Sequence, residues 1–513
     1  MILSNGRYIV IIAHLAAVGS FTVISPLAVM SMASRLASLL LILFAPFVGV
    51  AQQDNDAWYP VPAQHYGFIQ YDENVISLPH GLDSFFYKLQ ALKHNHNGRV
   101  NVIHIGDSHT QADGVTAVMR LGLQEYFGNA GRGLVFPYQL ANSNAPHDIR
   151  SSSNTSWKSN RLTSPDKPIA TGISGYGIHS ANQNAAVNIA LKDMDGRQER
   201  FNRMVFFLCN DNVCYRMSDS NLASPFTFNT TRSTTENSFT VNTDSMITSF
   251  QLAKVSSTNA VDYSFYGVSL EKRDTPGVLY HTIGVNGARY DQFLPNDLFW
   301  SQLKDLDGDL FIVSLGTNEA QNPTVNEAAL SATCDSFVRM IHRIAPHAAV
   351  LITTPAGSYY RKKKPNKSIQ NVADALKRYC TTAHVPYWDL LDVSGGVPGT
   401  LSWKKLSLIS QDLVHYNNAG YYLQGQLLLN AVAKSYNTFE KAHPYAVKKA
   451  AAPAKATPAN KIIKTEVVKA KLPPEPAKAP EPKKPEVPPT LKPSVPEDQP
   501  TKPGSNIKVQ YEW

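Results

Sequence analysis

A serine, a histidine and an aspartate in this sequence have the types and surroundings that nucleophilic catalysis needs. Ser108 stands in the run Gly106-Asp-Ser-His109, directly after an apolar stretch, and Asp412 precedes His415 by three positions. A serine hydroxyl becomes a nucleophile when a base lies beside it and a third group orients that base. We therefore expect His415 to be the base for Ser108, and Asp412 to hold one nitrogen of its imidazole.

Attack on an ester also needs hydrogen-bond donors for the negative charge that develops on the carbonyl oxygen. Three donors are expected after predicted strands: the backbone N–H of Ser108, the backbone N–H of Gly287 and the side-chain amide of Asn318. Each also has a structural interpretation, because serine caps helices, glycine makes turns and asparagine caps loops.

The elements that must position these residues alternate between strands and helices. The predicted strands are 100–105, 278–283, 309–315, 348–354 and 385–390. The predicted helices are 82–93, 111–127, 290–306, 324–344, 369–383 and 419–434. This alternation indicates a parallel sheet covered on both faces, and ligands bind at the carboxyl edge of such sheets. The spacing of Asp412 and His415 predicts that they share one face of a helical turn at that edge.

The pattern changes between the second predicted helix and the second predicted strand. Residues 129–277 are rich in Ser, Thr and Asn, with short β-branched and aromatic runs. This texture favours an inserted all-β module, a sandwich or a jelly roll, of a kind that often binds carbohydrate. Trp157, Tyr176 and Tyr215 are candidates for stacking on sugars, although single aromatic residues more often belong to the core. A purely structural insertion is the alternative.

Both ends of the chain differ from this globular part. Arg35, the apolar run after it and small residues up to Ala51 resemble a signal peptide, with the true start at Met30 or Met32; a membrane span over 8–29 is the alternative. The end of the chain is rich in Ala, Lys, Pro and Glu and should not form a core. The predicted organisation is a signal peptide or mis-called extension at 1–51, a lead-in at 52–81, an α/β domain from 82–128 and 278–442, the β module at 129–277, and a disordered tail at 443–513.

The formal net charge of the 513 residues is +8, but much of the lysine excess lies in the tail. The folded part should be closer to neutral, which gives nucleic-acid binding little support, while a basic tail suits an anionic polymer or surface. We expect membrane contact only transiently, through the signal segment. The four cysteines fit no zinc pattern, and export would allow the pairs Cys209–Cys214 and Cys334–Cys380, with buried free thiols as the alternative for the second.

Four short blocks of this sequence together resemble the SGNH hydrolases, also called GDSL-type esterases. The blocks are Gly106-Asp-Ser-His109, the turn that contains Gly287, Gly316-Thr-Asn318 and Asp412-Leu-Val-His415, in the order of that family. The resemblance covers roughly 82–128 and 278–434 and implies a flavodoxin-like three-layer α/β fold. It implies that Ser108 is the nucleophile, His415 the base and Asp412 its orienting partner. It further implies an oxyanion hole from Ser108, Gly287 and Asn318, with no metal and no organic cofactor.

One branch of the family is closer than the rest. His109 stands where the family name has leucine, and this departure is familiar among the peptidoglycan O-acetylesterases. The longer runs 106–113, 127–133 and 284–288 resemble that branch, as does a β module inserted between the first two blocks. The resemblance implies removal of O-acetyl groups from an acetylated polysaccharide, peptidoglycan foremost, in the periplasm or cell envelope.

Three other functions stay open on the sequence. The same residues would serve an exported esterase of another polysaccharide, such as xylan. Gly106-Asp-Ser-His109 also resembles a metal-dependent phosphoesterase motif, although no set of bridging carboxylates is evident in the later blocks. A non-catalytic wall-binding protein is the third, and the presence of every triad residue weighs against it.

Overall fold

The computed structural model describes residues 57–60, 65–194, 196–208, 213–219, 224–229, 237–255 and 263–445. The predicted signal peptide at 1–51, Cys209 and the tail from residue 446 lie outside the described residues. Within the described part of the chain, every helix is too short or too polar to cross a membrane.

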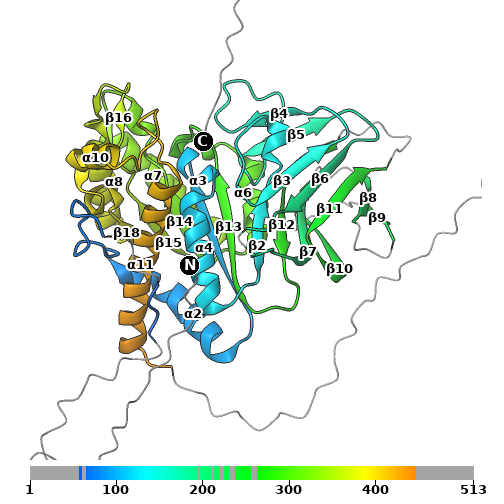
Figure 1. Ribbon diagram of the computed structural model, residues 1–513, viewed down its shortest axis with the longest axis horizontal. Helices are drawn as coiled ribbons and strands as arrows, with labels where there is room; N and C mark the ends of the chain where they lie inside the picture. Colours follow the sequence, from blue (N-terminus) through cyan, green and yellow to red (C-terminus); the bar gives the residue numbers. More distant parts are fainter. Residues whose placement is uncertain are drawn as a thin grey trace, which may run out of the picture. The chain divides into compact units, whose positions relative to one another are not determined.

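Among the described residues, a five-stranded parallel sheet forms the centre of the α/β part (Figure 1). Its spatial order is β13–β1–β14–β15–β18, which is 2-1-3-4-5 in chain order and therefore flavodoxin-like. The strands are β1 (Arg99–Gly106), β13 (Gly277–Gly284), β14 (Leu310–Ser314), β15 (Ala349–Thr353) and β18 (Tyr387–Trp388). Each predicted strand is confirmed, and the last is shorter than predicted.

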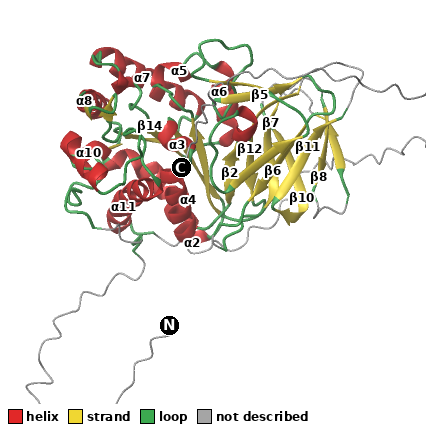
Figure 2. Cartoon of the chain, turned by 45° about the horizontal axis from the view of Figure 1, so that its top comes forward, coloured by secondary structure: helices red, strands yellow, loops and turns green. Residues whose placement is uncertain are grey.

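Helices cover both faces of this sheet, as Figure 2 shows. The covering helices are α2 (Asp83–Asn95), α4 (Gly114–Phe127) and α11 (Asn418–Ala442) on one face, and α7 (Glu327–Ile344) and α8 (Ser368–Ala383) on the other. Successive residues of β1 alternate between the two faces: Val102 is buried in the core that includes α11, and Ile103 in the core that includes α7. This alternation explains why the run reads as continuously apolar.

The described residues between 131 and 271 form two antiparallel sheets. The first has the order β10–β7–β12–β5–β4 with β2 also paired to β12, and the second has the order β3–β6–β11–β8–β9. The strands are β2 (Gly131–Val135), β3 (Ile149–Ser153), β4 (Lys158–Arg161), β5 (Tyr176–Ser180), β6 (Ala186–Leu191), β7 (Phe201–Leu208), β8 (Cys214–Ser218), β9 (Phe226–Asn229), β10 (Phe239–Ile247), β11 (Ser249–Lys254) and β12 (Tyr263–Glu271). Their apolar residues join the same core as α7 and α8, so the two parts are packed as one body.

Other segments lie along the two edges of the parallel sheet. At β13, Asn129 forms a parallel bridge with Val278, and β2 runs alongside. Gly133 of β2 has φ +80°, and an added Cβ would lie 2.1 Å from the carbonyl oxygen of Tyr280, so only glycine permits this approach. At β18, Ser77 and Tyr387 exchange backbone hydrogen bonds of 2.9 and 3.2 Å.

Residues from the predicted lead-in at 52–81 are packed on the α/β part. Trp58 is buried, its backbone N–H donates to the Asn437 side chain of α11 at 2.9 Å, and Ile76 belongs to the same core. Three short 3₁₀ helices lie outside the predicted elements or at their ends: η1 (Pro79–Leu82), η2 (Tyr138–Ala141) and η4 (Glu319–Gln321).

Two predicted helices are wrong as single elements. The helix predicted at 111–127 is split into α3 (Ser108–Gln111) and α4, because Asp113 has left-handed backbone angles, with φ +65°. The helix predicted at 290–306 is split into α5 (Tyr290–Phe293), α6 (Asp297–Leu303) and η3 (Lys304–Leu306). Pro295 cannot continue a helix, and the Asn296 side chain caps α6 by accepting the Phe299 N–H.

Two short strands and two helices were not predicted from the sequence. They are β16 (Tyr359–Tyr360) and β17 (Lys364–Pro365), which form a hairpin, and α9 (Leu390–Val393) and α10 (Gly396–Lys405). Two-residue strands carry no readable alternation, and α10 holds two glycines and a proline, which are poor helix formers.

A buried ion network joins the β module to α4. Arg132 of β2 is 2% exposed and donates to Asp113 at 2.7 Å and to Asp148. Arg120 of α4 donates to Asp113 at 2.8 Å. The carboxylate of Asp113 therefore holds two arginines at the point where α3 ends and α4 begins.

We expect Arg132→Ala to lower the free energy of unfolding by about 3–5 kcal/mol, because Arg120 alone then balances the charges of Asp113 and Asp148. Urea titration followed by circular dichroism measures this loss. The matched variant Arg339→Ala removes only the exposed partner of Asp335 on α7 and should cost at most about 1 kcal/mol. Equal stability of the two variants would contradict a structural role for the network.

Candidate active site

Ser108 lies at the first turn after β1. Asp107 caps α3 by accepting the backbone N–H of His109 at 2.9 Å, and Ser108 is the first residue of that helix. The turn is tight: a Cβ added at Gly106 would lie 2.1 Å from the hydroxyl oxygen of Thr110. Ser108 is half-buried at the carboxyl end of the strand, as the sequence predicts.

Asp412 and His415 lie in the loop between α10 and α11, so the predicted helical turn is wrong. Leu413 has a left-handed φ of +61°, and Oδ1 of Asp412 accepts the backbone N–H groups of Val414 and His415, each at 2.9 Å. Oδ2 of Asp412 is 2.6 Å from Nδ1 of His415. An aspartate turn, and not helical periodicity, therefore brings the two side chains together.

The second imidazole nitrogen faces the serine: Nε2 of His415 is 2.7 Å from Oγ of Ser108. Residues 307 positions apart are thus joined in one hydrogen-bonded chain, Asp412–His415–Ser108. Burial opposes the charged imidazole, but the hydrogen bond and charge of Asp412 outweigh it and raise the pKa of His415. Burial also opposes the charged carboxylate, yet these hydrogen bonds hold the pKa of Asp412 well below its ordinary value. The arrangement suits proton removal from Ser108 by a neutral His415.

The turn that follows β13 lies against α3. The backbone N–H of Val285 donates to the carbonyl of Gly106 at 3.1 Å, and that of Asn286 donates to Oε1 of Gln111 at 2.9 Å. Gly287 has φ +82°, a conformation that favours glycine, although space for a side chain is available there.

Asn318 reaches the same turn from the loop after β14. Its Nδ2 donates to the carbonyl of Ala288 at 3.0 Å and lies 3.3 Å from Oδ2 of Asp107. The structure therefore brings the loops of Ser108, Gly287 and Asn318 together at one edge of the sheet, beside His415.

Two carboxyl groups are buried next to this cluster. Burial raises the pKa of Asp107 to about 6, although His109 N–H, His415 and Thr317 favour its charged form. Burial also raises the pKa of Glu319 to about 7, and its Oε1 accepts the backbone N–H of Tyr290 at 2.9 Å. Both groups act as acceptors that fix neighbouring loops.

His109 packs beside the triad histidine. The centroids of the His109 and His415 rings are 5.1 Å apart, and Nδ1 of His109 is 3.0 Å from the hydroxyl of Tyr421. Burial, together with His415, lowers the pKa of His109 to about 3. His109 is therefore neutral when His415 takes up a proton, and it adds no charge repulsion.

Comparisons with known proteins give a matching family model and similar solved structures. Residues 238–423 match the model of the GDSL-like Lipase/Acylhydrolase family. A solved structure of a peptidoglycan O-acetylesterase is similar to this chain, with a TM-score of 0.59 and 20% identity, over 69% of this chain and 96% of that one. A lipase/acylhydrolase from Enterococcus faecalis matches with a TM-score of 0.25 and 17% identity, over 31% of this chain and 77% of its own. A search of curated proteins finds no match.

The residues that match this family model lie mostly in the α/β part, which therefore resembles an SGNH hydrolase domain. The chain is accordingly a carboxylic ester hydrolase, as the sequence predicts. Gly287, Asn318, Asp412 and His415 lie within the residues that match the family model, whereas Ser108 precedes them.

Sequence reasoning gave no role to two residues that support this hydrolase site. Gln111 accepts from Asn286 and from the hydroxyl of Tyr176 at 2.9 Å, and its Nε2 donates to Ser143 and Asn144 at 2.8 Å. Tyr421 binds His109 from α11. The sequence offered one signal for Gln111: it is a polar side chain at a buried position of the predicted helix 111–127.

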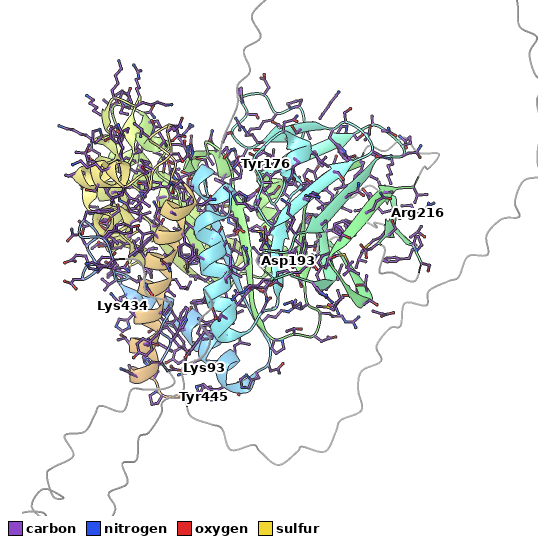
Figure 3. The ribbon with its side chains drawn as sticks, in the orientation of Figure 1. Lys93, Tyr176, Asp193, Arg216, Lys434 and Tyr445 are labelled. Carbon is purple, nitrogen blue, oxygen red and sulfur yellow. The ribbon has the colours of Figure 1, made fainter. Side chains whose placement is uncertain are left out.

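Some expectations about the hydrolase are corrected. Tyr176 of β5, labelled in Figure 3, is 2% exposed and Tyr215 is fully buried, so neither presents its ring to a sugar. Trp157 is partly buried against Tyr263, with ring centroids 5.0 Å apart. Among the described cysteines, Cys214, Cys334 and Cys380 carry free thiols, so of the two alternatives for Cys334 and Cys380 the structure has the buried free thiols. In the described residues, no group of three His, Cys, Asp or Glu side chains is arranged to hold a metal ion.

We expect His415 of the hydrolase to titrate above the ordinary histidine value of about 6.5, and His109 to stay neutral between about pH 5 and 8. Imidazole NMR titration measures both, with signals assigned from His415→Gln and His109→Gln. In Asp412→Asn the stabilising charge is lost while burial persists, so the His415 midpoint should move to lower pH. An unchanged midpoint would show that Asp412 does not hold the imidazole in solution.

Proposed function

We propose that this hydrolase is a serine esterase that removes O-acetyl groups from a cell-envelope polysaccharide, with peptidoglycan as the substrate. The observation that carries the proposal is the hydrogen-bonded chain Asp412–His415–Ser108, with distances of 2.6 and 2.7 Å. An acyl transfer needs a nucleophile, a base and an orienting group in this order.

In the proposed reaction, Oγ of Ser108 attacks the acetyl carbonyl while Nε2 of His415 takes the hydroxyl proton. His415 then returns that proton to the sugar oxygen as the ester bond breaks, and Ser108 carries the acetyl group. Water attacks the acetyl-serine with His415 again as base; the bond between the acetyl group and Oγ then breaks, His415 returns the proton to Ser108, and acetate leaves. Because the base must be neutral, activity is lost as the pH falls through the raised pKa of His415.

The proposed oxyanion hole consists of the backbone N–H groups of Ser108 and Gly287 and the side-chain amide of Asn318. Nδ2 of Asn318 has acceptors at 3.0 Å (Ala288) and 3.3 Å (Asp107). Donation to the oxyanion therefore exchanges the longer contact, with Asp107, for the developing charge, which is the stronger acceptor. Asp107 keeps the His109 N–H when this happens.

The substrate part of the proposal has two supports. One similar solved structure, which covers 69% of this chain, is a peptidoglycan O-acetylesterase. The β module, proposed as a carbohydrate-binding jelly roll, also has a cavity of about 590 Å³ lined partly by Lys158, His179 and Ser264, whose polar groups suit sugar hydroxyls. Export to the periplasm or cell envelope rests on residues 1–51 of the sequence alone.

We expect Ser108→Ala to lower acetate release from O-acetylated peptidoglycan by a factor on the order of 10⁴ or more, because no other group replaces the nucleophile. Ser336→Ala is the matched control, since that hydroxyl bonds only to its own helix, at the carbonyl of Ala332. Acetylated xylan, assayed in parallel, should release acetate more slowly. Activity that survives Ser108→Ala but is lost with a chelator would instead favour the metal-dependent phosphoesterase class.

Removal of the Asn318 amide should lower kcat about 10²- to 10³-fold with little change in KM, because the lost donor acts mainly on the transition state. Steady-state kinetics of Asn318→Ala on a small acetyl ester measure this effect. Asn322→Ala, an exposed amide in the same loop, is the control. A rise in KM at constant kcat would assign Asn318 to substrate binding.

A further inference from the structure

A cluster of exposed cationic side chains lies on the β16–β17 hairpin and at the end of α10. We call it the basic patch and define it as residues 361–364, Lys367, Lys404 and Lys405, all of which are exposed. The stretches 354–373 and 395–411 contain no Asp or Glu. No ion pair joins the patch to a carboxylate among the described residues. Its positive charge is therefore not neutralised within this part of the protein.

The hairpin holds the patch together by contacts with aromatic rings. The Lys404 ammonium lies 5.2 Å from the ring centre of Tyr359, and the Arg361 guanidinium lies 5.1 Å from that of Tyr360. Arg361 and Lys362 have left-handed φ values of +49° and +57°, where Asn or Gly is the ordinary choice. The turn thus carries long cationic side chains at positions where backbone geometry favours other residues.

Both ends of the hairpin are tied to the loops of the proposed active site. The backbone N–H of Tyr359 donates to the carbonyl of Leu413, between Asp412 and His415, at 2.7 Å. Nδ2 of Asn366 donates to the carbonyl of Ala320, two residues after Asn318, at 2.8 Å. Figure 1 shows β16 on the same upper side of the α/β part as α3, which begins at Ser108.

This anchoring places the charges close to the serine site. The turn begins two residues beyond Tyr359, which at about 3.3 Å per residue is roughly 7 Å of strand. Exposed charges interact over a Debye length of about 8–10 Å at moderate ionic strength. The field of the patch therefore reaches the Leu413 loop, beside which a polymer with its ester group at Ser108 would extend.

We infer that the basic patch binds an anionic segment of the substrate polymer, so that the enzyme acts on a polyanion and not on a neutral glycan. The inference rests on the proposed esterase function and narrows its substrate class. Peptidoglycan carries free carboxylates on its peptides and fits this requirement, whereas an uncharged acetylated xylan does not.

An anionic membrane is the competing partner. Leu401 and Leu406 of the α10 region are 47% and 48% exposed beside Lys404 and Lys405, and apolar residues among cations suit a lipid surface. The polymer is favoured because the hairpin is hydrogen-bonded to the loops that carry His415 and Asn318, which ties the patch to the reaction site.

The test compares kinetics on O-acetylated peptidoglycan with kinetics on p-nitrophenyl acetate, a small neutral ester, using the full chain. In the triple variant Lys362→Gln, Lys363→Gln, Lys364→Gln, we expect KM for peptidoglycan to rise about tenfold at constant kcat, because three exposed charge contacts with the polymer are lost. The ratio of the two substrates' kcat/KM should fall by the same factor, and added salt should raise the wild-type KM toward that of the variant. The corresponding triple change to arginine should restore the wild-type KM.

A matched control removes three exposed cations from the β module: Arg197→Gln, Arg200→Gln, Arg216→Gln. Arg216 of β8, labelled in Figure 3, lies at the opposite end of the view from α10, labelled in Figure 1. The basic tail is the same in every variant. An equal rise in KM in this control would overturn the inference, because net charge alone would then explain the effect.

A binding measurement separates failure of the inference from failure of the esterase proposal. Ser108→Ala protein should sediment with peptidoglycan, and the three lysine-to-glutamine changes should weaken that binding about tenfold. If the wild type hydrolyses no acetyl ester but the lysine changes weaken binding to peptidoglycan, the inferred binding site is supported and the esterase proposal fails. If hydrolysis is seen and the lysine changes alter neither binding nor KM, the inference fails. Lysine-dependent binding to phosphatidylglycerol–phosphatidylcholine vesicles, without any effect on peptidoglycan, would also overturn it and assign the patch to a membrane.

Discussion

The hydrogen bond between Asp412 and His415 is the contact on which the geometry of the site depends. Each oxygen of Asp412 has a separate task, because Oδ1 accepts two backbone N–H groups of its own loop and Oδ2 binds the imidazole. The same carboxylate thus folds the loop and orients the base. Ser108 meets His415 only because β1 and the segment before α11 end at the same edge of the parallel sheet. The chemistry follows from local folding of one loop on a rigid scaffold.

The β module takes part in building this edge. Its residues Ser143, Asn144 and Tyr176 all bind Gln111, whose Oε1 holds the turn that contains Gly287. Arg132 of β2 reaches Asp113, where α3 gives way to α4. The position of the proposed oxyanion donors therefore depends on polar contacts from residues inserted between the first two blocks of the hydrolase domain. A displacement of the module would move the Gly287 turn before it moved the triad.

The sequence predicted the parallel sheet and the residues at its edge because both leave local signals. A buried parallel strand is a continuous apolar run, and Gly106 marks the close turn before Ser108.

The features that the sequence could not predict depend on partners elsewhere in the fold. Asp113 breaks a well-patterned helix because arginines from α4 and β2 hold its carboxylate. The Asp412–His415 spacing reads as helical, but the left-handed Leu413 forms a different turn. The β16–β17 hairpin was missed because its strands are too short for any periodicity, and Cys334 and Cys380 remain thiols despite a spacing that allowed pairing.

Because other segments cover both edges of the parallel sheet, removing the β module or the lead-in would expose an edge strand. Asn129 and β2 lie on β13, and Ser77 occupies the backbone groups of β18. A bare edge strand offers its amide and carbonyl groups to any other extended chain and promotes aggregation. Excising the module to obtain a minimal hydrolase would uncover β13, and trimming the lead-in would uncover β18. The segments that appear accessory by sequence are those that cover the backbone groups at both edges of the central sheet.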